Sequence, residues 1–285
     1  MGDNLVNING IQVGDRHPVR LMGVINLSPE SFYRGSVAVA DSDIEQVVSN
    51  FEEDGADFID IGAASTAPKN IYGTASVSVE EEVRRIGFAM KIITNITDLP
   101  ISVDTTSSVV AEMALDMGAA LINDVSGLQE DSEMAGLVAS RDVPVILMAS
   151  CGLPCKSVRS SLDTLKKSYK IALDEEISRK KIILDPGIGF GKETDVDCKI
   201  LHNLNKFLAL GQPLLVGVSR KAFIGELVGT KNPAERLTGS IAATAIAVYN
   251  GANVIRSHDI KDTKEAIRIG EAIRTRGGMN RDRMG

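Results

Sequence analysis

Tryptophan is absent from this sequence of 285 residues, and aromatic residues make up only 4% of it. Surfaces that stack nucleic-acid bases depend on aromatic side chains, so this scarcity argues against one. Basic residues are also in short supply, because 31 lysines and arginines stand against 38 acidic residues and leave a net charge of −7. A broad phosphate-backbone footprint needs the opposite balance. We therefore expect no nucleic-acid partner.

Long hydrophobic runs are missing as well. The most apolar stretch, Ile241–Val248, is too short to span a membrane and contains Thr244. Residues 1–15 have neither the basic nor the apolar part of a secretory signal. The three cysteines, Cys151, Cys155 and Cys198, are too few for a disulfide framework and indicate a reducing compartment. We expect a soluble, cytoplasmic protein with no membrane partner.

The sequence does contain a regular alternation of short apolar runs and longer amphipathic segments. Nearly continuous apolar runs are typical of parallel strands covered on both faces. The predicted strands are Leu21–Ile25, Phe58–Ile61, Pro100–Val103, Ala120–Ile122, Pro144–Met148, Ile182–Leu184, Leu214–Val218 and Asn253–Ile255. The predicted helices are Asp41–Asp54, Ser78–Ile96, Thr106–Met117, Asp131–Ser140, Ser160–Arg179, Asp195–Leu208, Pro233–Asn250 and Asp262–Thr275. Eight such pairs predict an α/β fold, a (β/α)8 TIM barrel; an open doubly wound sheet is the alternative.

The two ends of the chain add to this pattern. Leu5–Ile8 and Ile11–Val13 flank Asn9-Gly10, a strong signal for a two-residue hairpin. We expect this N-terminal β-hairpin, within residues 1–15, to close the bottom of the barrel. Residues 277–285 are predicted to be a frayed tail, and residues 1–285 a single domain. Ser78 and Glu81 have the spacing of a capping box at the start of one helix.

Polar side chains follow almost every predicted strand, which is where a barrel carries its chemistry. Any one of them has a simpler explanation: Asp60, Asp104 and Asp124 are each typical helix caps when taken alone. Together they are sorted by type. Carboxylates and an amide come from the middle strands, at Asp104, Asn123 and Asp185. Cations come from the last two strands, at Lys221, Arg256 and His258.

This sorting predicts a ligand with two unlike ends. Asp185 can accept two parallel N–H groups from an amino-heterocycle, and Asn123 offers both a donor and an acceptor. Arg256 and His258 suit an anion such as phosphate. The substrate is therefore expected to join a flat, uncharged ring to an anionic group.

Three other features are interpreted as structural. The glycine-rich segment from Gly187 to Lys192 lacks the spacing of a phosphate-binding Walker loop, and Glu193 stands where serine or threonine is needed. Cys151 and Cys155 have no second ligand pair near them in sequence, so a loop of free thiols is expected rather than a metal site. His17 and His202 lie away from the strand ends.

At these residues the sequence resembles the dihydropteroate synthases, which are pterin-binding barrels of the folate pathway. The matching segments run in order through nearly the whole chain. They are Met22-Gly-Val-Ile-Asn26-Leu-Ser-Pro29-Glu-Ser-Phe32, Asp60-Ile-Gly62 with Ser65-Thr66 and Pro68, Ile101-Ser-Val-Asp104-Thr, Ile122-Asn-Asp-Val-Ser-Gly127, Leu184-Asp-Pro-Gly-Ile-Gly-Phe-Gly-Lys192, Gly217-Val-Ser-Arg-Lys221, Arg236-Leu-Thr-Gly-Ser240 and Arg256-Ser-His258-Asp. Each is weak alone, whereas the ordered set is specific.

The resemblance implies a transferase that joins 6-hydroxymethyl-7,8-dihydropterin diphosphate to p-aminobenzoate with release of diphosphate. By motif, the pterin-binding residues would be Asp104, Asn123, Asp185, Lys221, Thr66, Met148 and Phe190. The diphosphate would be held by Asn26, Thr66, Arg256 and His258, with Asn26 also binding Mg2+. The residues expected to contribute to catalysis are Asp104, Lys221, Arg256 and His258. Two loops, at about residues 27–39 and 63–77, would close over the site, and a homodimer is expected.

Several positions depart from the family pattern. They are Glu30, Arg34, Ala67, Ala149-Ser150 and Ala222. These positions are expected on the loops or the acceptor side, so the acceptor is either p-aminobenzoate held differently or a related arylamine. Three other functions remain as alternatives: a methyl-tetrahydropterin-binding methyltransferase, a pterin-binding protein without synthase activity, and a generic phosphate-binding barrel enzyme.

Overall fold

The chain forms a closed barrel of eight parallel strands, as the alternation predicts. The computed structural model describes residues 5–28, 40–63, 77–151 and 155–276. The barrel strands are β3 (Arg20–Asn26), β4 (Phe58–Gly62), β5 (Ile101–Asp104), β6 (Leu121–Asp124), β7 (Val145–Met148), β8 (Ile182–Asp185), β9 (Leu215–Gly217) and β10 (Val254–Ser257). Their order is β8-β7-β6-β5-β4-β3-β10-β9. A parallel bridge between Leu184 and Leu214 joins the two ends, so the TIM barrel is confirmed and the open sheet is not.

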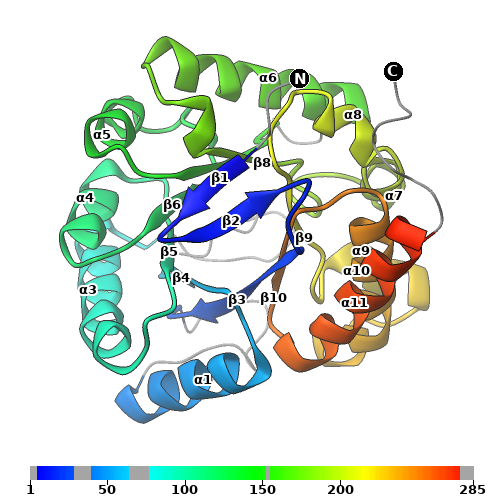
Figure 1. The fold of residues 1–285 in the computed structure, drawn as a ribbon, viewed down its shortest axis with the longest axis horizontal. Helices are drawn as coiled ribbons and strands as arrows, with labels where there is room; N and C mark the ends of the chain where they lie inside the picture. Colours follow the sequence, from blue (N-terminus) through cyan, green and yellow to red (C-terminus); the bar gives the residue numbers. More distant parts are fainter. Residues whose placement is uncertain (1–4, 29–39, 64–76, 152–154, 277–285) are drawn as a thin grey trace.

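Helices surround the barrel on its outside (Figure 1). They are α1 (Asp41–Asp54), α3 (Val79–Ile96), α4 (Ser108–Asp116), α5 (Glu133–Arg141), α6 (Val158–Asp174), α7 (Thr194–His202), α8 (Leu204–Leu208), α9 (Ala222–Val228), α10 (Leu237–Tyr249) and α11 (Ile260–Arg276), with the short 3-10 turns η2 (Arg179–Lys181) and η3 (Pro233–Arg236). Within the described ranges, no helix is both long enough and apolar enough to cross a membrane.

Three helix predictions need correction. The segment predicted as Ser160–Arg179 stops at Asp174, because Glu176 adopts a left-handed φ of 61° that a helix cannot continue through. The segment predicted as Asp195–Leu208 divides at Asn203 into α7 and α8. Helix α9 was not predicted, since its seven residues are too few to display a helical period.

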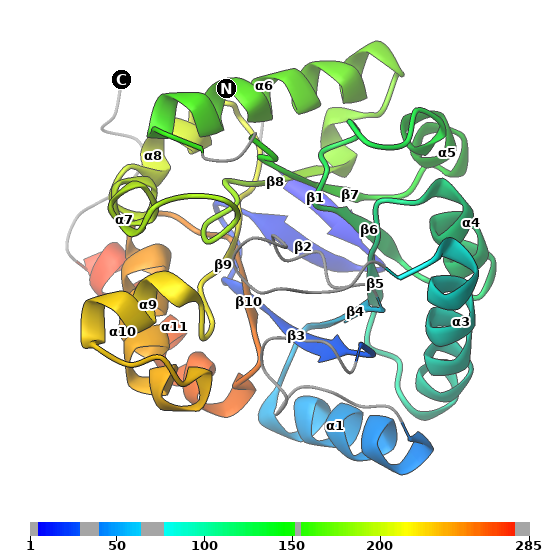
Figure 2. The same cartoon turned by 180° about the vertical axis from the view of Figure 1, so that it is seen from behind.

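The N-terminal hairpin closes the bottom of the barrel, as expected. Strands β1 (Leu5–Ile8) and β2 (Ile11–Gly14) pair antiparallel around Asn9 and Gly10, whose φ values of 47° and 90° suit a tight hairpin turn. Its buried face packs on inward side chains at the amino ends of the barrel strands. This cluster contains Val6, Ile8, Val13, Met22, Phe58, Leu121, Ile146, Ile183, Leu215 and Val254. Figure 1 views the barrel from the hairpin end, and Figure 2 from the opposite end.

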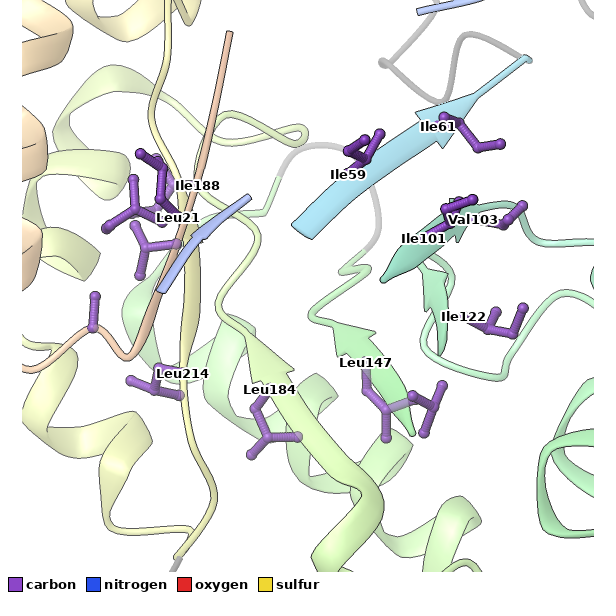
Figure 3. Close-up of a cluster of buried hydrophobic side chains, with 14 of the residues drawn as sticks. Leu21, Ile59, Ile61, Ile101, Val103, Ile122, Leu147, Leu184, Ile188 and Leu214 are labelled. Atoms are coloured by element: carbon purple, nitrogen blue, oxygen red, sulfur yellow. The ribbon is translucent and has the colours of Figure 1, made fainter. Parts of the chain in front are cut away.

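The outward side chains of the same strands form the main core with the helices. They are buried residues such as Ile59, Ile61, Leu147 and Leu184, and Figure 3 shows how neighbouring strands contribute them. Since successive side chains point to opposite faces, an apolar shell faces the helices while a separate column of positions faces the barrel axis. This second column carries the candidate site.

Helix α3 begins with half of the predicted capping box. Ser78 Oγ accepts the backbone N–H of Glu81 at 3.3 Å. The Glu81 carboxylate instead pairs with Arg84 and Arg85. Arg85 also donates to the carbonyl of Ala63 at 3.2 Å, which ties this helix to the carboxyl end of β4.

The hairpin contact gives a stability prediction. Ile8→Ala removes a side chain that is 1% exposed, so it should lower the free energy of unfolding by about 2–5 kcal/mol. Ile96→Ala, at an exposed position on α3, is the matched control and should cost about 1 kcal/mol or less. Chemical denaturation measures both. Equal costs would show that the hairpin does not contribute to the core.

Candidate functional site

Polar side chains occupy the inward positions at the carboxyl ends of the strands. Along each strand the residue two places beyond an inward apolar side chain also faces the axis; Asp60, for example, follows Phe58 in this way. The residues at this second level are Asp60, Asp104, Asn123, Met148, Asp185 and Arg256. They come from six different strands, and hydrogen bonds join four of them, Arg256, Asp60, Asp104 and Asn123.

Arg256 is the centre of this group. Its Nε donates to Asp60 Oδ2 at 2.6 Å, and its Nη2 donates to Asp104 Oδ2 at 2.9 Å. Asp60 Oδ2 also accepts from Asn123 Nδ2 at 3.2 Å. One guanidinium therefore serves two buried carboxylates, and one of those carboxylates also holds an amide.

Asp60 is a site residue that the sequence interpretation missed. Taken alone it is typical of a helix cap, but it lies within β4, is fully buried and faces the barrel interior. Its position two residues after Phe58 in a strand was the available signal. Asp124 stabilises a turn rather than a helix end: its carboxylate accepts the backbone N–H groups of Ser126 and Leu128, both at 2.8 Å, and the next helix begins only at Glu133.

Three oxygens in this group are buried without a partner among the described residues. They are Asp60 Oδ1, Asp104 Oδ1 and Asn123 Oδ1. A buried acceptor that lacks a hydrogen bond costs about 1–3 kcal/mol. The arrangement is therefore incomplete by itself, and it suits a ligand that carries several N–H donors.

Asp185 begins a glycine-rich turn beside this group. Its Oδ1 accepts the backbone N–H of Gly187 at 2.7 Å. Gly187, Gly189 and Gly191 all have positive φ, between 67° and 78°. Lys192 turns back to donate to the carbonyls of Gly187 and Phe190. Since its ammonium is engaged by its own loop, the rejection of a Walker-type phosphate loop is supported.

Lys221 lies across this turn. Its ammonium donates to the carbonyl of Ile188 and stands 4.7 Å from the centre of the Phe190 ring. A Cβ on Gly189 would come within 2.6 Å of Lys221 Cδ, so only glycine leaves room for the lysine stem. Lys221 and Phe190, both predicted to bind the ring, are thus neighbours, and Met148 lies beside the same turn, because a Cβ on Gly187 would come within 3.2 Å of Met148 Cγ.

Burial governs the protonation of these groups. It raises the pKa of Asp104 to about 7, with Arg256 opposing the rise and Asp60 adding to it. It raises the pKa of Asp185, with Lys221 opposing, and lowers the pKa of Lys221 to about 8. Buried groups avoid charge unless a partner compensates them. Asp104 and Lys221 therefore change charge close to physiological pH.

His258 differs from its prediction in one respect. The sequence pattern groups it with the cations, but burial and the nearby Arg256 lower its pKa to about 3, so the ring is neutral at pH 7. Its Nδ1 lies 2.9 Å from Ser219 Oγ. In the ligand-free chain it acts as a hydrogen-bonding group rather than a charge.

Several predicted residues have no description here or lie at the edge of the group. Thr66, together with Glu30, Arg34 and Ala67, falls outside the described residues. Asn26 ends β3, where it pairs in register with Gly62. It is partly exposed at the mouth of the barrel.

The expectation of free thiols after β7 is wrong, because Cys151 and Cys155 form a disulfide. Cys198 is a free thiol. The backbone N–H of Cys155 donates to the Gly191 carbonyl at 2.8 Å, and this hydrogen bond joins Cys155 to the end of the glycine-rich turn. No group of three or more His, Cys, Asp or Glu side chains among the described residues is placed to hold a metal ion. The Cα atoms of Cys151 and Cys155 lie 5.5 Å apart, a proximity that their spacing in the sequence does not predict.

The fold and the mouth together define a class of protein. A closed (β/α)8 barrel that concentrates buried acids, an amide and two cations at the carboxyl ends of its strands is built to bind a small polar ring and an anion. The structure thus defines a barrel enzyme that acts on a small molecule.

Comparison with known proteins narrows this class. The family described as "Pterin binding enzyme" matches residues 22–258. The dihydropteroate synthase of Clostridium beijerinckii is 36% identical over 268 residues, covering 92% of this chain and 96% of that protein. Two structures of the Xanthomonas albilineans dihydropteroate synthase are similar: one with 4-aminobenzoic acid (TM-score 0.85, 34% identity, 95% and 98% of the two chains) and one with 7,8-dihydropteroate (0.81, 33%, 94% and 98%). The chain belongs to the dihydropteroate synthase family of pterin-binding enzymes.

The contact between Gly189 and Lys221 is open to a controlled test. Gly189→Ala should weaken the binding of a dihydropterin about tenfold or more, which corresponds to 1.4 kcal/mol, because the new methyl group displaces Lys221. Gly229→Ala is the matched control: its φ of 77° gives a similar backbone cost, but nothing lies within 4 Å of the new Cβ. Calorimetric titration measures both. Similar affinities for the two variants would contradict the placement of Lys221 in the ring site.

Proposed function

We propose that the chain joins 6-hydroxymethyl-7,8-dihydropterin diphosphate to an arylamine and releases diphosphate. The convergence of three unpartnered buried oxygens with Asp185, Lys221 and Arg256 is the observation that carries this proposal. A pterin supplies a flat set of N–H donors, and a diphosphate supplies the anion. The relatives named as dihydropteroate synthases support the same reaction.

The pterin ring would lie against the second inward level of the barrel. Asp185 would accept from the amino-pyrimidine edge, and Asp104 and Asn123 would accept further ring N–H groups through their unpartnered oxygens. Lys221 would donate to the ring carbonyl or a ring nitrogen. Met148 and Phe190 would cover its apolar faces.

The diphosphate would bind where β3 and β10 end. Arg256 and the neutral ring of His258 would donate to its oxygens, with Thr66 as a further predicted contact. Mg2+ in proteins is commonly held by one or two side-chain oxygens together with substrate phosphates. The amide oxygen of Asn26, at the end of β3, fits such a partial site. When bound, the ion would neutralise charge that develops on the leaving diphosphate.

The reaction needs little covalent help from the chain. The arylamine nitrogen forms a bond to the methylene carbon as the bond from that carbon to the diphosphate oxygen breaks, and the nitrogen then loses a proton. Positive charge develops on the pterin and negative charge on the leaving group. Asp104 and Asp185 stabilise the first, while Arg256 and His258 stabilise the second. Their catalytic role is electrostatic.

The acceptor is p-aminobenzoate or a related arylamine. Ala149 and Ala222 replace residues that the family usually carries on this side, and neither offers a polar side chain. Ala149 is fully buried, and its N–H donates to the Asp185 carbonyl at 2.8 Å. Acceptor recognition would therefore rest on other groups.

We further infer a homodimer in the cytoplasm, with residues 1–285 as one domain. Large apolar side chains are exposed on α9, α10 and α11, which lie side by side in Figure 1. They are Leu227, Val228, Ile246, Ile269 and Ile273. Exposed apolar side chains on neighbouring helices suit a protein–protein interface. The cytoplasmic location is inferred from the folate pathway that the family resemblance implies. The disulfide removes the other argument, which took the cysteines to indicate a reducing compartment.

An acceptor screen tests the reaction. Diphosphate release should depend on both pterin diphosphate and an arylamine, and p-aminobenzoate or a close derivative should support it. An assay over a panel of arylamines, with Asp185→Asn as the inactive control, measures this. Tight binding of pterin diphosphate without release for any arylamine would favour a binding protein instead.

The pH dependence of kcat/KM tests the electrostatics, because this constant reports the free enzyme. Activity should rise through about pH 7 as Asp104 ionises and fall above about pH 8 as Lys221 loses its proton. In Lys221→Arg the guanidinium stays charged, so the fall should move to a higher pH. A falling limb that does not move would contradict the role of Lys221.

A further inference from the structure

The segments that follow β9 and β10 are joined by two adjacent pairs of side chains. Ser219 Oγ lies 2.9 Å from Nδ1 of His258 and accepts the backbone N–H of the same residue at 3.3 Å. Next to it, Arg220 binds Asp259 through two bonds, Nε to Oδ2 at 2.9 Å and Nη2 to Oδ1 at 2.7 Å. We call these two pairs the clasp. Lys221 follows one side of the clasp, and His258 belongs to the other.

Arg220 is engaged too fully to bind a substrate. Its side chain is almost completely buried, and its remaining Nη1 donates to the carbonyls of Pro233 and Ala234. Its backbone N–H donates to Ser240 Oγ at 2.8 Å, and its carbonyl accepts from Arg236 at 2.9 Å. These contacts hold Arg220 within the fold, and through them it supports its neighbours Ser219 and Lys221.

The backbone of Arg220 is strained in a way that needs such support. Its φ of 54° is in the left-handed region, which costs a residue other than glycine about 1–3 kcal/mol. Conformations of this kind persist where surrounding contacts determine them. Here the turn directs Ser219 toward His258 and lets Lys221 reach Ile188 on the other side.

The first pair bears on which ring nitrogen of His258 carries the hydrogen. Ser219 Oγ accepts the backbone N–H of His258 and keeps its own hydrogen to donate to the lone pair on Nδ1, which is the arrangement we infer. A neutral imidazole that accepts at Nδ1 carries its hydrogen on Nε2. His258 is then set to donate from Nε2 to an anion.

We propose that Ser219, Arg220 and Asp259 are positioning residues, which hold His258 as the Nε2–H tautomer and fix it at a set distance from Lys221. The clasp thereby keeps His258, at the diphosphate end of the site, at a fixed distance from Lys221, at the pterin end. The effects that we expect on ligand binding rest on the proposed function. The tautomer of His258 can be measured without any turnover.

The tautomer is measured first, by nitrogen-15 NMR of the ligand-free protein labelled at histidine. The chain has three histidines, so the signals can be assigned by replacing His17 and His202 one at a time. His258 should be the Nε2–H form in the unaltered chain and in Ser219→Thr, which keeps the hydroxyl. In Ser219→Ala it should become a mixture of forms. An unchanged signal in Ser219→Ala would overturn the proposal.

Ligand affinities separate a positioning role for Ser219 from a merely structural one. Ser219→Ala should weaken the binding of pterin diphosphate about tenfold, roughly the loss of one charge-assisted hydrogen bond. It should leave the binding of the pterin alcohol, which lacks diphosphate, unchanged, and Ser219→Thr should restore the affinity. Equal losses for both ligands would contradict the proposal.

The second pair is tested by Asp259→Asn, which keeps the shape of the side chain and removes its charge. Both ligands should bind more weakly in this variant, because Lys221 and His258 lose their common support. Unchanged affinity for both would overturn the role of the ion pair. If the variant does not fold, the Ser219 measurements still decide the proposal. A tautomer that behaves as expected in a chain that releases no diphosphate would contradict the proposed function and leave the clasp intact.

Discussion

The candidate site depends on one guanidinium shared between two buried carboxylates. Arg256 on β10 holds Asp60 on β4 and Asp104 on β5, and Asp60 in turn holds Asn123 on β6. A buried charge is stable only when it is paired and hydrogen-bonded. With two acids for one base, the pairing fixes the geometry of four strands and still leaves oxygens unsatisfied. The arrangement is complete only when a ligand with N–H donors and an anionic group joins it.

The barrel separates stability from function along each strand. The first inward level is apolar and packs on the N-terminal hairpin, while the outward side chains pack on the helices. Two residues further along, the inward level is polar and gains little from burial. Because a strand places alternate residues on one face, a core position and a site position lie only two residues apart on that face. The stable part of the fold thus supports a mouth whose buried acids would be costly if they stood alone.

Much of this organisation could be predicted from sequence. Parallel strands in a barrel must bring their carboxyl ends together, so Asp104, Asn123 and Asp185 could be grouped without coordinates. Asp60 stands inside the predicted strand Phe58–Ile61, so its place in the strand was available from sequence, whereas its pairing with Arg256 is a tertiary fact. The neutral state of His258 depends on burial and on Arg256, which are tertiary facts. The Cys151–Cys155 disulfide depends on a loop conformation that spacing does not specify.

Thermal unfolding of Asp60→Asn, recorded with and without a dihydropterin ligand, tests the shared-guanidinium account most directly. The substitution keeps the shape of the side chain and removes the surplus buried charge, while Arg256 keeps Asp104 as its partner. The account predicts a melting temperature that is unchanged or higher without ligand, and a much smaller stabilisation by ligand than in the unaltered chain. A lower melting temperature together with an undiminished ligand shift would show that Asp60 serves the fold rather than the site.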